Sequence, residues 1–161
     1  MCMRIKVILV GKVKEKYLTA GIAEYLKRLG PYARVEFAQV ADEPIPEGAA
    51  PAQEQQVKAR EGERILAQID AGQYVIAMDL RGQVLSSEEL AGFLAERALR
   101  GQPNLAFVIG GSLGLSAQVM QRADFTLSLG KMTFLHQMVP LILLEQVYRG
   151  FKINRGEPYH K

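Results

Sequence analysis

Two glycine-bearing strand ends, close together in the last third of the chain, restrict the folds that this sequence can adopt. The first is Phe107-Val-Ile-Gly-Gly-Ser-Leu-Gly-Leu115, an apolar run that leads into a loop. The second is Leu127-Ser-Leu-Gly-Lys-Met-Thr-Phe-Leu-His-Gln137, in which a strand ends at a glycine and small or polar residues follow. Glycine has no Cβ, so its backbone can approach a ligand closely. Open α/β sheets build ligand crevices from such loops at the carboxyl ends of their strands, and we expect a small ligand here.

Apolar runs and stretches of helical periodicity alternate along the whole sequence. The predicted strands are 4–10, 35–40, 74–78, 104–109 and 125–129, and the predicted helices are 14–29, 52–69, the segment from Ser86, 116–122 and 138–149. Strands that alternate with helices indicate an α/β fold with a mainly parallel sheet, in which 74–78 is a central strand. Ser86-Ser-Glu-Glu89 is a capping box and predicts a helix start. The stretch 41–51, with three prolines and one glycine, predicts a loop.

Length and composition limit the class of protein. At 161 residues we expect a single domain, residues 1–161. Cys2 is the only cysteine, which excludes an internal disulfide and a cysteine-based metal cluster. The two histidines, His136 and His160, are far apart and lack neighbouring ligands, so we expect no metal site. Arg4 interrupts the first apolar run, which indicates a strand and not a signal peptide, and no run approaches a membrane span. We expect a cytoplasmic protein with no membrane partner.

Charge is distributed unevenly although the net charge is only +3. Residues 1–34 carry a net +6, residues 35–129 a net −6 and residues 130–161 a net +3. Basic ends around an acidic middle are typical of a protein that binds a polyanion, because phosphate binding depends on local basic patches. Solvated helix faces that differ in sign are the alternative explanation.

The glycine loop does not match the common nucleotide-binding motifs. Gly110-Gly-Ser-Leu-Gly114 fits neither the G-x-G-x-x-G spacing nor the P-loop pattern, and a strand-to-helix turn that binds nothing would have the same residues. Asp79 follows the third predicted strand, where a carboxylate can bind a ribose or an amine, or can simply form a turn. No serine lies in a nucleophile elbow.

The C-terminal region carries two further signals. Leu141-Ile-Leu-Leu144 is apolar on every side of its predicted helix, which indicates that a second subunit covers one face. The tail Phe151-Lys-Ile-Asn-Arg-Gly-Glu-Pro-Tyr-His-Lys161 combines cations, aromatic rings and a histidine. That mixture suits a nucleic-acid site, since cations contact phosphates and aromatic rings stack on extruded bases.

Several strings, in order along nearly the whole chain, resemble the RlmH (YbeA-type) family of SPOUT methyltransferases. They are Val10-Gly-Lys-Val-Lys-Glu-Lys-Tyr17, Ala23-Glu-Tyr-Leu-Lys-Arg-Leu29, Phe107-Val-Ile-Gly-Gly-Ser, Leu-Ser-Leu-Gly-Lys-Met-Thr-Phe, Leu144-Glu-Gln-Val-Tyr-Arg149 and the terminal Pro-Tyr-His-Lys. The resemblance implies an open, mainly parallel sheet with helices on both faces and a C-terminal trefoil knot. It also implies a homodimer through the C-terminal helix.

The resemblance further implies a cofactor, S-adenosylmethionine, and a substrate, 23S ribosomal RNA. The implied reaction is methylation of N3 of a pseudouridine in helix 69, on the assembled ribosome. The residues that match the family's cofactor pocket are Met78, Gly110, Leu129, Gly130, Lys131, Met132, Thr133 and Phe134.

Three residues near the C-terminus are candidates for catalysis on this basis. The N3 of pseudouridine carries a proton, so the reaction needs orientation, deprotonation and a dry site. His160 is the candidate base because histidine titrates near neutrality. Tyr159 is expected to stack on the target base, and Arg149 to hold a phosphate or an oxygen that gains charge. The tail of one subunit would complete the site of the other.

The sequence departs from the family at three positions. Gly130 replaces a common serine, Leu135 a common proline, and Pro140 an arginine associated with RNA binding. Pro140 would kink its helix unless it lies in the first turn. A non-catalytic ribosome-binding factor is therefore one alternative. A nucleotide-dependent enzyme such as a dehydrogenase is another, although its glycine spacing is absent.

Overall fold

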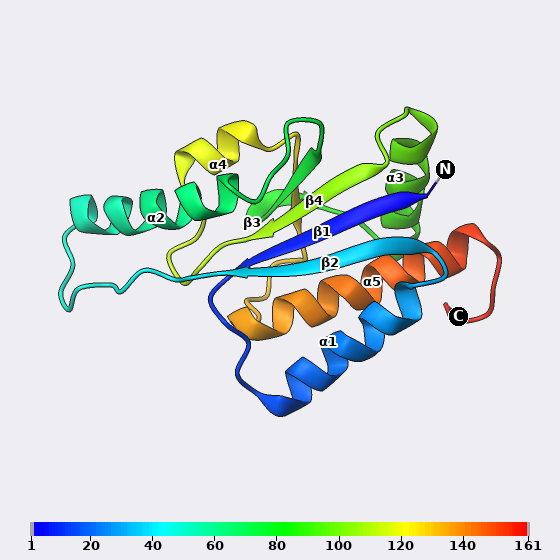
Figure 1. Ribbon diagram of the computed structural model, residues 1–161, viewed down its shortest axis with the longest axis horizontal. Coiled ribbons are helices and arrows are strands. Elements are labelled where there is room, and N and C mark those ends of the chain that lie inside the picture. The colour runs from blue at the N-terminus through cyan, green and yellow to red at the C-terminus, as the bar shows by residue number, and fades with distance from the viewer. Residues whose placement is uncertain (1, 161) are drawn as a thin grey trace.

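The computed structural model describes residues 2–160, and a five-stranded parallel sheet forms its centre (Figure 1). Its order is β2-β1-β4-β3-β5, and every strand pair is parallel. The strands are β1 Met3–Val10, β2 Ala33–Val40, β3 Tyr74–Val84, β4 Asn104–Ile109 and β5 Phe125–Ser128. The helices are α1 Lys16–Leu29, α2 Pro51–Leu66, α3 Ser87–Leu99, α4 Ala117–Arg122, the short 3-10 helix η1 His136–Met138, and α5 Val139–Asn154. All five strand carboxyl ends therefore lie along one edge of the sheet.

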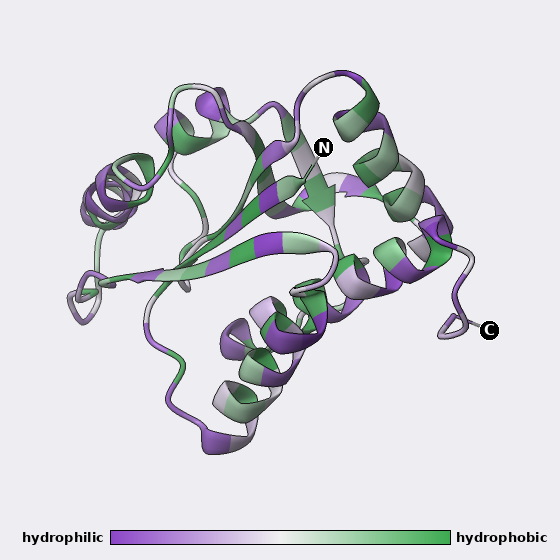
Figure 2. Ribbon diagram, turned by 45° about the vertical axis from the view of Figure 1, so that its right-hand side comes forward, coloured by the Kyte–Doolittle hydropathy of each residue, from purple (hydrophilic) through white to green (hydrophobic). Residues whose placement is uncertain are grey.

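Helices cover both faces of the sheet, as expected for this fold class. One core joins the strands to α1, α3 and α5, and the other joins them to α2 and α4. The interior strands are buried on both faces: Val7, Ile8 and Leu9 in β1 are fully buried, as is Phe107 in β4. In the edge strand β2, apolar and polar residues alternate, as the colours in Figure 2 show. The trefoil knot implied by the resemblance stays a prediction.

The third strand is longer than the sequence predicted. The apolar run ends at Met78, but the pairing of β3 with β5 resumes at Gln83 after an irregular stretch. Residues Leu80 and Val84 in this extension are mostly exposed, so no hydrophobic signal marks it. A Cβ on Gly82 would lie 2.7 Å from the carbonyl carbon of Thr126, so only glycine fits beside β5. The extension was missed because backbone pairing, and not burial, stabilises it.

The helix starts predicted from the sequence agree with the structure better than the predicted helix ends. The capping box is confirmed, since the Glu89 backbone N–H donates to Ser86 Oγ at 3.0 Å and the Ser86 N–H donates to Glu89 Oε1 at 2.8 Å. Pro140 lies in the first turn of α5, where a missing N–H leaves no hydrogen bond unmade and causes no kink. The predicted ends at 69 for α2 and 149 for α5 were wrong, because α2 stops at Leu66 and α5 runs to Asn154.

The apolar run near the start of α5 is only half covered by its own chain. Leu143 and Leu144 are fully buried, whereas Leu141 and Ile142 are partly exposed. Leu141 packs against α1 at Gly21, where a Cβ would lie 2.9 Å from its Cδ2. Within the described part of the chain, no helix has both the length and the apolar character needed to cross a membrane.

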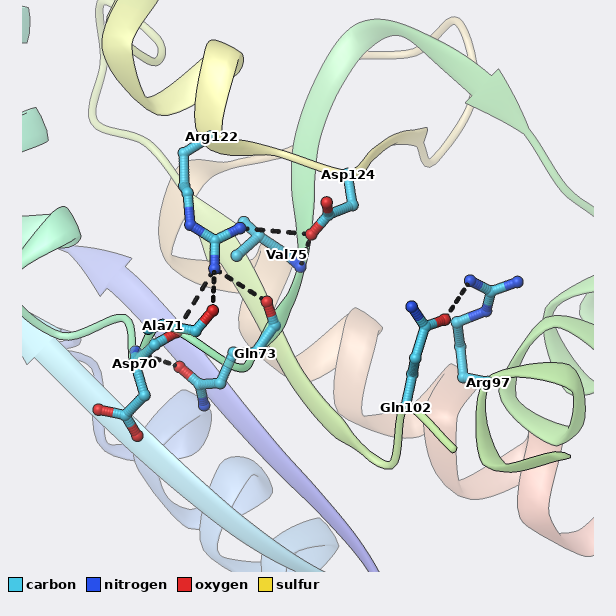
Figure 3. A network of polar contacts seen from close by, with 8 residues as sticks. All are labelled: Asp70, Ala71, Gln73, Val75, Arg97, Gln102, Arg122 and Asp124. Carbon is cyan, nitrogen blue, oxygen red and sulfur yellow. Dashed lines mark hydrogen bonds and ion pairs between the residues drawn. The ribbon is translucent and has the colours of Figure 1, made fainter. Parts of the chain in front are cut away.

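Arg122, at the end of α4, connects two turns at the amino end of β3 (Figure 3). Its guanidinium donates to the carbonyl of Gln73 at 2.9 Å and to those of Asp70 and Ala71 at 3.4 Å, and it pairs with Asp124 at 3.3 Å. Asp124 in turn accepts the Val75 N–H at 2.8 Å. In the same view Arg97 donates to Gln102 at 2.8 Å, after α3. These contacts hold the loops that lie opposite the glycine-bearing strand ends.

We expect Arg122→Ala to lower the free energy of unfolding by about 1–2 kcal/mol, because it removes charged hydrogen bonds to three carbonyls. Urea denaturation of the purified protein measures this change. Arg100→Ala is the control: Arg100 forms an exposed ion pair with Glu96, whose loss should cost less than about 0.5 kcal/mol. Equal effects for both variants would contradict the role of the Arg122 contacts.

Candidate active site

A cavity of about 610 Å³ opens at the carboxyl edge of the sheet, between the ends of β3, β4 and β5. Four segments line it: the irregular part of β3, the glycine loop after β4, the segment after β5, and the start of α5. The lining residues are Met78, Asp79, Leu80, Arg81, Ile109, Gly110, Gly111, Ser112, Leu113, Gly114, Leu127, Leu129, Met132, Thr133, Phe134, His136 and Val139. Its size and its mix of apolar walls with a few polar groups are typical of small-molecule sites.

Most residues assigned to the cofactor by resemblance meet at this cavity. Six of the eight line it, from three different segments of the chain: Met78, Gly110, Leu129, Met132, Thr133 and Phe134. Gly130 and Lys131 lie in the same loop but are not part of the lining. The structure thus brings the predicted cofactor residues together, whereas their contacts with a cofactor stay a prediction.

The glycine loop is packed too closely for a side chain at Gly110. A Cβ there would lie 2.9 Å from the carbonyl carbon of Gly114 and 2.9 Å from Leu115 Cδ2. Gly114 has φ +91, a conformation that favours glycine, and its N–H donates to the carbonyl of Gly111 at 3.0 Å. The loop therefore lines the cavity with the bare backbone of its glycines beside the residues Ser112 and Leu113.

The loop after β5 is also shaped by a glycine. Gly130 has φ +124, and its N–H donates to Ser128 Oγ at 3.1 Å. The same hydroxyl donates to the carbonyl of Gly130 at 3.0 Å. Because a serine at position 130 would be strained at this φ, the departure from the family residue matches the local backbone of this chain.

His136 belongs to the cavity although the sequence analysis gave it no role. Its Nε2 lies 2.6 Å from the carbonyl oxygen of Val10, at the end of β1, and the ring lines the cavity. The adjacent Gln137 accepts the Lys14 N–H at 3.1 Å. These contacts cross more than a hundred residues of sequence, so no local pattern indicates them.

Asp79 lines the cavity, as its place after the third predicted strand suggested. Its carboxylate accepts the Arg81 backbone N–H at 2.8 Å and the Arg81 guanidinium at 3.0 and 3.1 Å. The hydrogen bond from the Arg81 side chain lowers the pKa of Asp79 below its usual value. Asp79 is therefore a carboxylate held in place by its neighbour, at the open side of the cavity.

Glu61 on α2 is a second residue that the sequence did not single out. It is 4% exposed, and its Oε1 has no hydrogen-bond partner. The other oxygen accepts the Glu43 N–H at 3.0 Å. The carboxyl group lies directly behind the glycine loop, since a Cβ on Gly111 would be 2.9 Å from Oε1. Burial raises the pKa of Glu61, so its protonated form is favoured in the folded protein.

The three candidate catalytic residues also lie together, in a cluster formed by α5 and the tail. Arg149 Nη1 donates to His160 Nδ1 at 3.1 Å, and its guanidinium lies over the Tyr159 ring at 4.8 Å. Arg149 also pairs with Glu145 at 3.0 Å. The tail, often a frayed element, is thus fixed onto α5 in this structure.

Protonation within this tail cluster follows from its contacts. Since Arg149 donates to Nδ1 of His160, the neutral ring carries its proton on Nε2, which lies 2.7 Å from Glu88 Oε1. Burial raises the pKa of Tyr159 well above its usual value, and its hydroxyl lies 2.9 Å from that of Tyr25. Tyr159 therefore stays a neutral phenol at physiological pH. Both ring nitrogens of His160 are occupied in this structure, and Nδ1, which carries no proton in the neutral ring, is the one able to accept a proton once Arg149 turns away from it.

The tail cluster does not line the large cavity of its own chain. Arg149 is ten residues beyond Val139 on α5, which corresponds to about 15 Å along a helix. A smaller cavity of about 180 Å³, lined by Ser86, Leu129 and Gln146 among others, lies between them. No group of three or more His, Cys, Asp or Glu residues within 2–160 is arranged to hold a metal ion.

The pKa of Glu61 predicts a pH-dependent stability. A carboxyl whose pKa is raised on folding loses stability as pH rises above the unfolded value of about 4.3, because the folded state binds more protons. We expect Glu61→Gln to remove this loss, so the variant should gain stability relative to the parent between pH 5 and pH 8 on the order of 1 kcal/mol. The charge of Asp42 disfavours the ionised form of Glu61, and the charge of Arg64 favours it.

Chemical denaturation at several pH values measures this difference. Glu63→Gln is the matched control, because Glu63 is exposed on the same helix. If the stabilities of the parent protein and of Glu61→Gln change in parallel with pH, the buried carboxyl is not the cause of the pH dependence.

Comparison with known proteins identifies the family. A sequence model described as "Predicted SPOUT methyltransferase" matches residues 3–160. The ribosomal RNA large subunit methyltransferase H of Symbiobacterium thermophilum is 70% identical over 161 residues, covering 99% of this chain and 100% of that protein. The protein of the same name from Carboxydothermus hydrogenoformans is 60% identical over 159 residues, covering 99% and 100%.

A solved structure agrees at the level of fold. A "probable methyltransferase" from Bordetella pertussis Tohama I superposes with a TM-score of 0.55 at 15% identity, covering 92% of this chain and 96% of that chain. Fold, cavity and sequence relatives therefore lead to one assignment. This chain belongs to the SPOUT methyltransferase family, in its ribosomal RNA large subunit methyltransferase H branch.

Proposed function

We propose that this protein methylates N3 of a pseudouridine in helix 69 of 23S ribosomal RNA, with S-adenosylmethionine as methyl donor. The observation that carries the proposal is the cavity at the carboxyl edge, built from the segments that match the family's cofactor motifs. Relatives up to 70% identical are named as ribosomal RNA large subunit methyltransferases. Ribosomes as substrate place the reaction in the cytoplasm, and we expect the whole chain to act as one domain.

The cavity fits this cofactor in size and in chemistry. Its apolar wall, which includes Ile109, Leu127 and Phe134, suits a flat nucleoside ring. The glycine loop offers backbone groups with no Cβ in the way at Gly110. When bound, the cofactor supplies an activated methyl group on its sulfonium. The chain itself then has to orient the base and remove a proton from its nitrogen.

We assign the proton transfer to the tail cluster. His160 accepts the N3 proton at Nδ1, and Arg149, which donates to that nitrogen in this structure, turns away from it when the target base enters. Tyr159 supplies a neutral aromatic face for the target base. Because this cluster is about 15 Å along α5 from the large cavity of the same chain, a homodimer through α5 would bring the tail of one subunit to the cofactor of the other.

The partly exposed side chains of Leu141 and Ile142 support that interface. Pro140 takes the place of an arginine without disturbing α5, since it lies in the first turn. Pro140 is buried, and it removes one cation relative to the family residue but no backbone hydrogen bond.

The direct test supplies labelled S-adenosylmethionine and ribosomes from a strain that lacks this methylation, and then maps the label on the RNA. Label on the helix 69 pseudouridine is the expected result. Cofactor binding with no label would support the non-catalytic ribosome-binding factor instead. Binding of nicotinamide nucleotides in place of S-adenosylmethionine would support a dehydrogenase.

Gly110→Ala should weaken cofactor binding at least about tenfold, since the new methyl group would lie within 3 Å of the Gly114 backbone and would displace the loop. Isothermal titration calorimetry with S-adenosylmethionine measures this. Gly92→Ala is the control, because Gly92 is exposed in the middle of α3 with open space around it. That variant should bind normally and gain roughly 0.5–1 kcal/mol of stability. Unchanged affinity in Gly110→Ala would separate the loop from the cofactor.

His160→Ala should lower kcat by about 10²–10⁴-fold, the usual contribution of a general base, while cofactor affinity stays unchanged. The pH profile provides a second readout. The pH dependence of kcat should differ between the parent protein and the variant, because only the parent protein carries the base. Normal turnover of the variant would remove His160 from the mechanism.

A further inference from the structure

The loop between β1 and α1 carries three lysines that the proposed site does not use. Lys12, Lys14 and Lys16 are exposed, and none of them takes part in an ion pair among residues 2–160. Glu15 is the one acidic residue between them. We call residues 11–16 the lysine loop. Tyr17, directly after it, is 61% exposed.

The lysine loop leaves the sheet beside the glycine loop. β1 and β4 are neighbouring parallel strands, and Leu9 pairs with Ile109 in the register between them. The residues that follow, Val10 and Gly110, therefore start their loops next to each other at the carboxyl edge. His136 joins the two regions, because it lines the cavity and its Nε2 lies 2.6 Å from the Val10 carbonyl oxygen.

Three hydrogen bonds to two segments fix the backbone of the lysine loop. The Gly11 N–H donates to the carbonyl of Val40 at 2.8 Å. The Val13 N–H donates to Gln39 Oε1 at 2.8 Å, and the Val13 side chain is buried. The Lys14 N–H donates to Gln137 Oε1 at 3.1 Å. The backbone that carries the three lysines is thus held before any ligand arrives, and one of its supports, Gln137, follows the cofactor segment closely.

Negative charge nearby does not cancel these lysines. Glu43, which follows the neighbouring strand β2, is neutralised by Arg60 at 3.0 Å and Arg64 at 2.6 Å. Asp79 on the cavity edge is paired with Arg81. Three cations on one loop beside the cavity, none of them in an ion pair within residues 2–160, suit a ligand with several phosphates, such as a nucleic-acid backbone, better than a single small anion.

We infer that the lysine loop binds phosphates of the substrate RNA that flank the target nucleotide, and so positions the RNA over the cofactor cavity. This inference rests on the proposed function, since it names the surface by which the same substrate is held. It also divides the basic residues of the first 34: Lys12, Lys14 and Lys16 lie at the carboxyl edge of the sheet, whereas Arg4, Lys27 and Arg34 lie at the opposite end of the strands.

The test compares two variants that lose the same charge. One variant, Lys12→Ala/Lys14→Ala/Lys16→Ala, removes the three charges of the lysine loop. The other, Arg4→Ala/Lys27→Ala/Arg34→Ala, removes three exposed cations from the opposite end of the strands. Methyl transfer to unmodified ribosomes is measured over a range of salt concentrations. The lysine-loop variant should raise KM at least about tenfold with kcat nearly unchanged. The slope of log KM against log salt concentration should fall by about 2, since each phosphate contact with a single strand contributes about 0.7.

Calorimetry should show unchanged cofactor binding in both variants, which excludes a collapsed cavity as the cause of the raised KM. Equal KM and salt slope in the two variants, with an active parent protein, would overturn the inference and leave the proposed function intact. A parent protein with no transferase activity would overturn the proposed function. In that case fluorescence anisotropy with a labelled single-stranded RNA still tests the loop, and equal affinities of the two variants would overturn it.

Discussion

The packing of the turn at Gly110 and Gly111 is the constraint on which the rest of the site depends. One glycine faces the backbone of Gly114 and the other faces the carboxyl of Glu61, so neither position can hold a side chain. The opposite surface of the same turn is a wall of the large cavity. The cavity therefore takes its shape from contacts behind the wall, inside the core between β4 and α2, and is formed before a ligand binds. Such preorganisation lowers the entropy lost on binding.

The sequence predicted the helices and strands whose residue pattern is set by burial in the core or by local hydrogen bonds. The strand 104–109 was predicted with its correct limits, because β4 is apolar on both faces in the middle of the sheet. The capping box at Ser86 was predicted because both of its hydrogen bonds lie within four residues. The extension of β3 was missed because pairing with β5 stabilises it and produces no periodic apolar pattern. The end of α5 was placed too early, although its apolar spacing continues to Phe151 in the core.

The sequence predicted the parts of the site that lie in recognisable motifs. Both glycine-bearing strand ends and the mixture of residues in the tail were recognised from the residues alone, whereas the cofactor assignment of Leu129–Phe134 and the roles within the tail cluster depended on resemblance. Glu61 and His136 were missed for a physical reason: each acts on a segment distant in sequence, through a buried carboxyl or a single contact with a backbone carbonyl. A lone glutamate in a charged helix and a lone histidine after a strand have no local pattern that distinguishes such roles.

The position of α5 also affects how the chain can fold during its synthesis. Leu143, Leu144, Val147 and Phe151 fill the space beneath α1 and α3, so one face of the sheet stays open to water until the last helix docks. While those residues are still inside the exit tunnel of the ribosome, the preceding strands can pair but cannot close this core. The nascent chain therefore exposes apolar surface to chaperones until α5 has left the tunnel and docked.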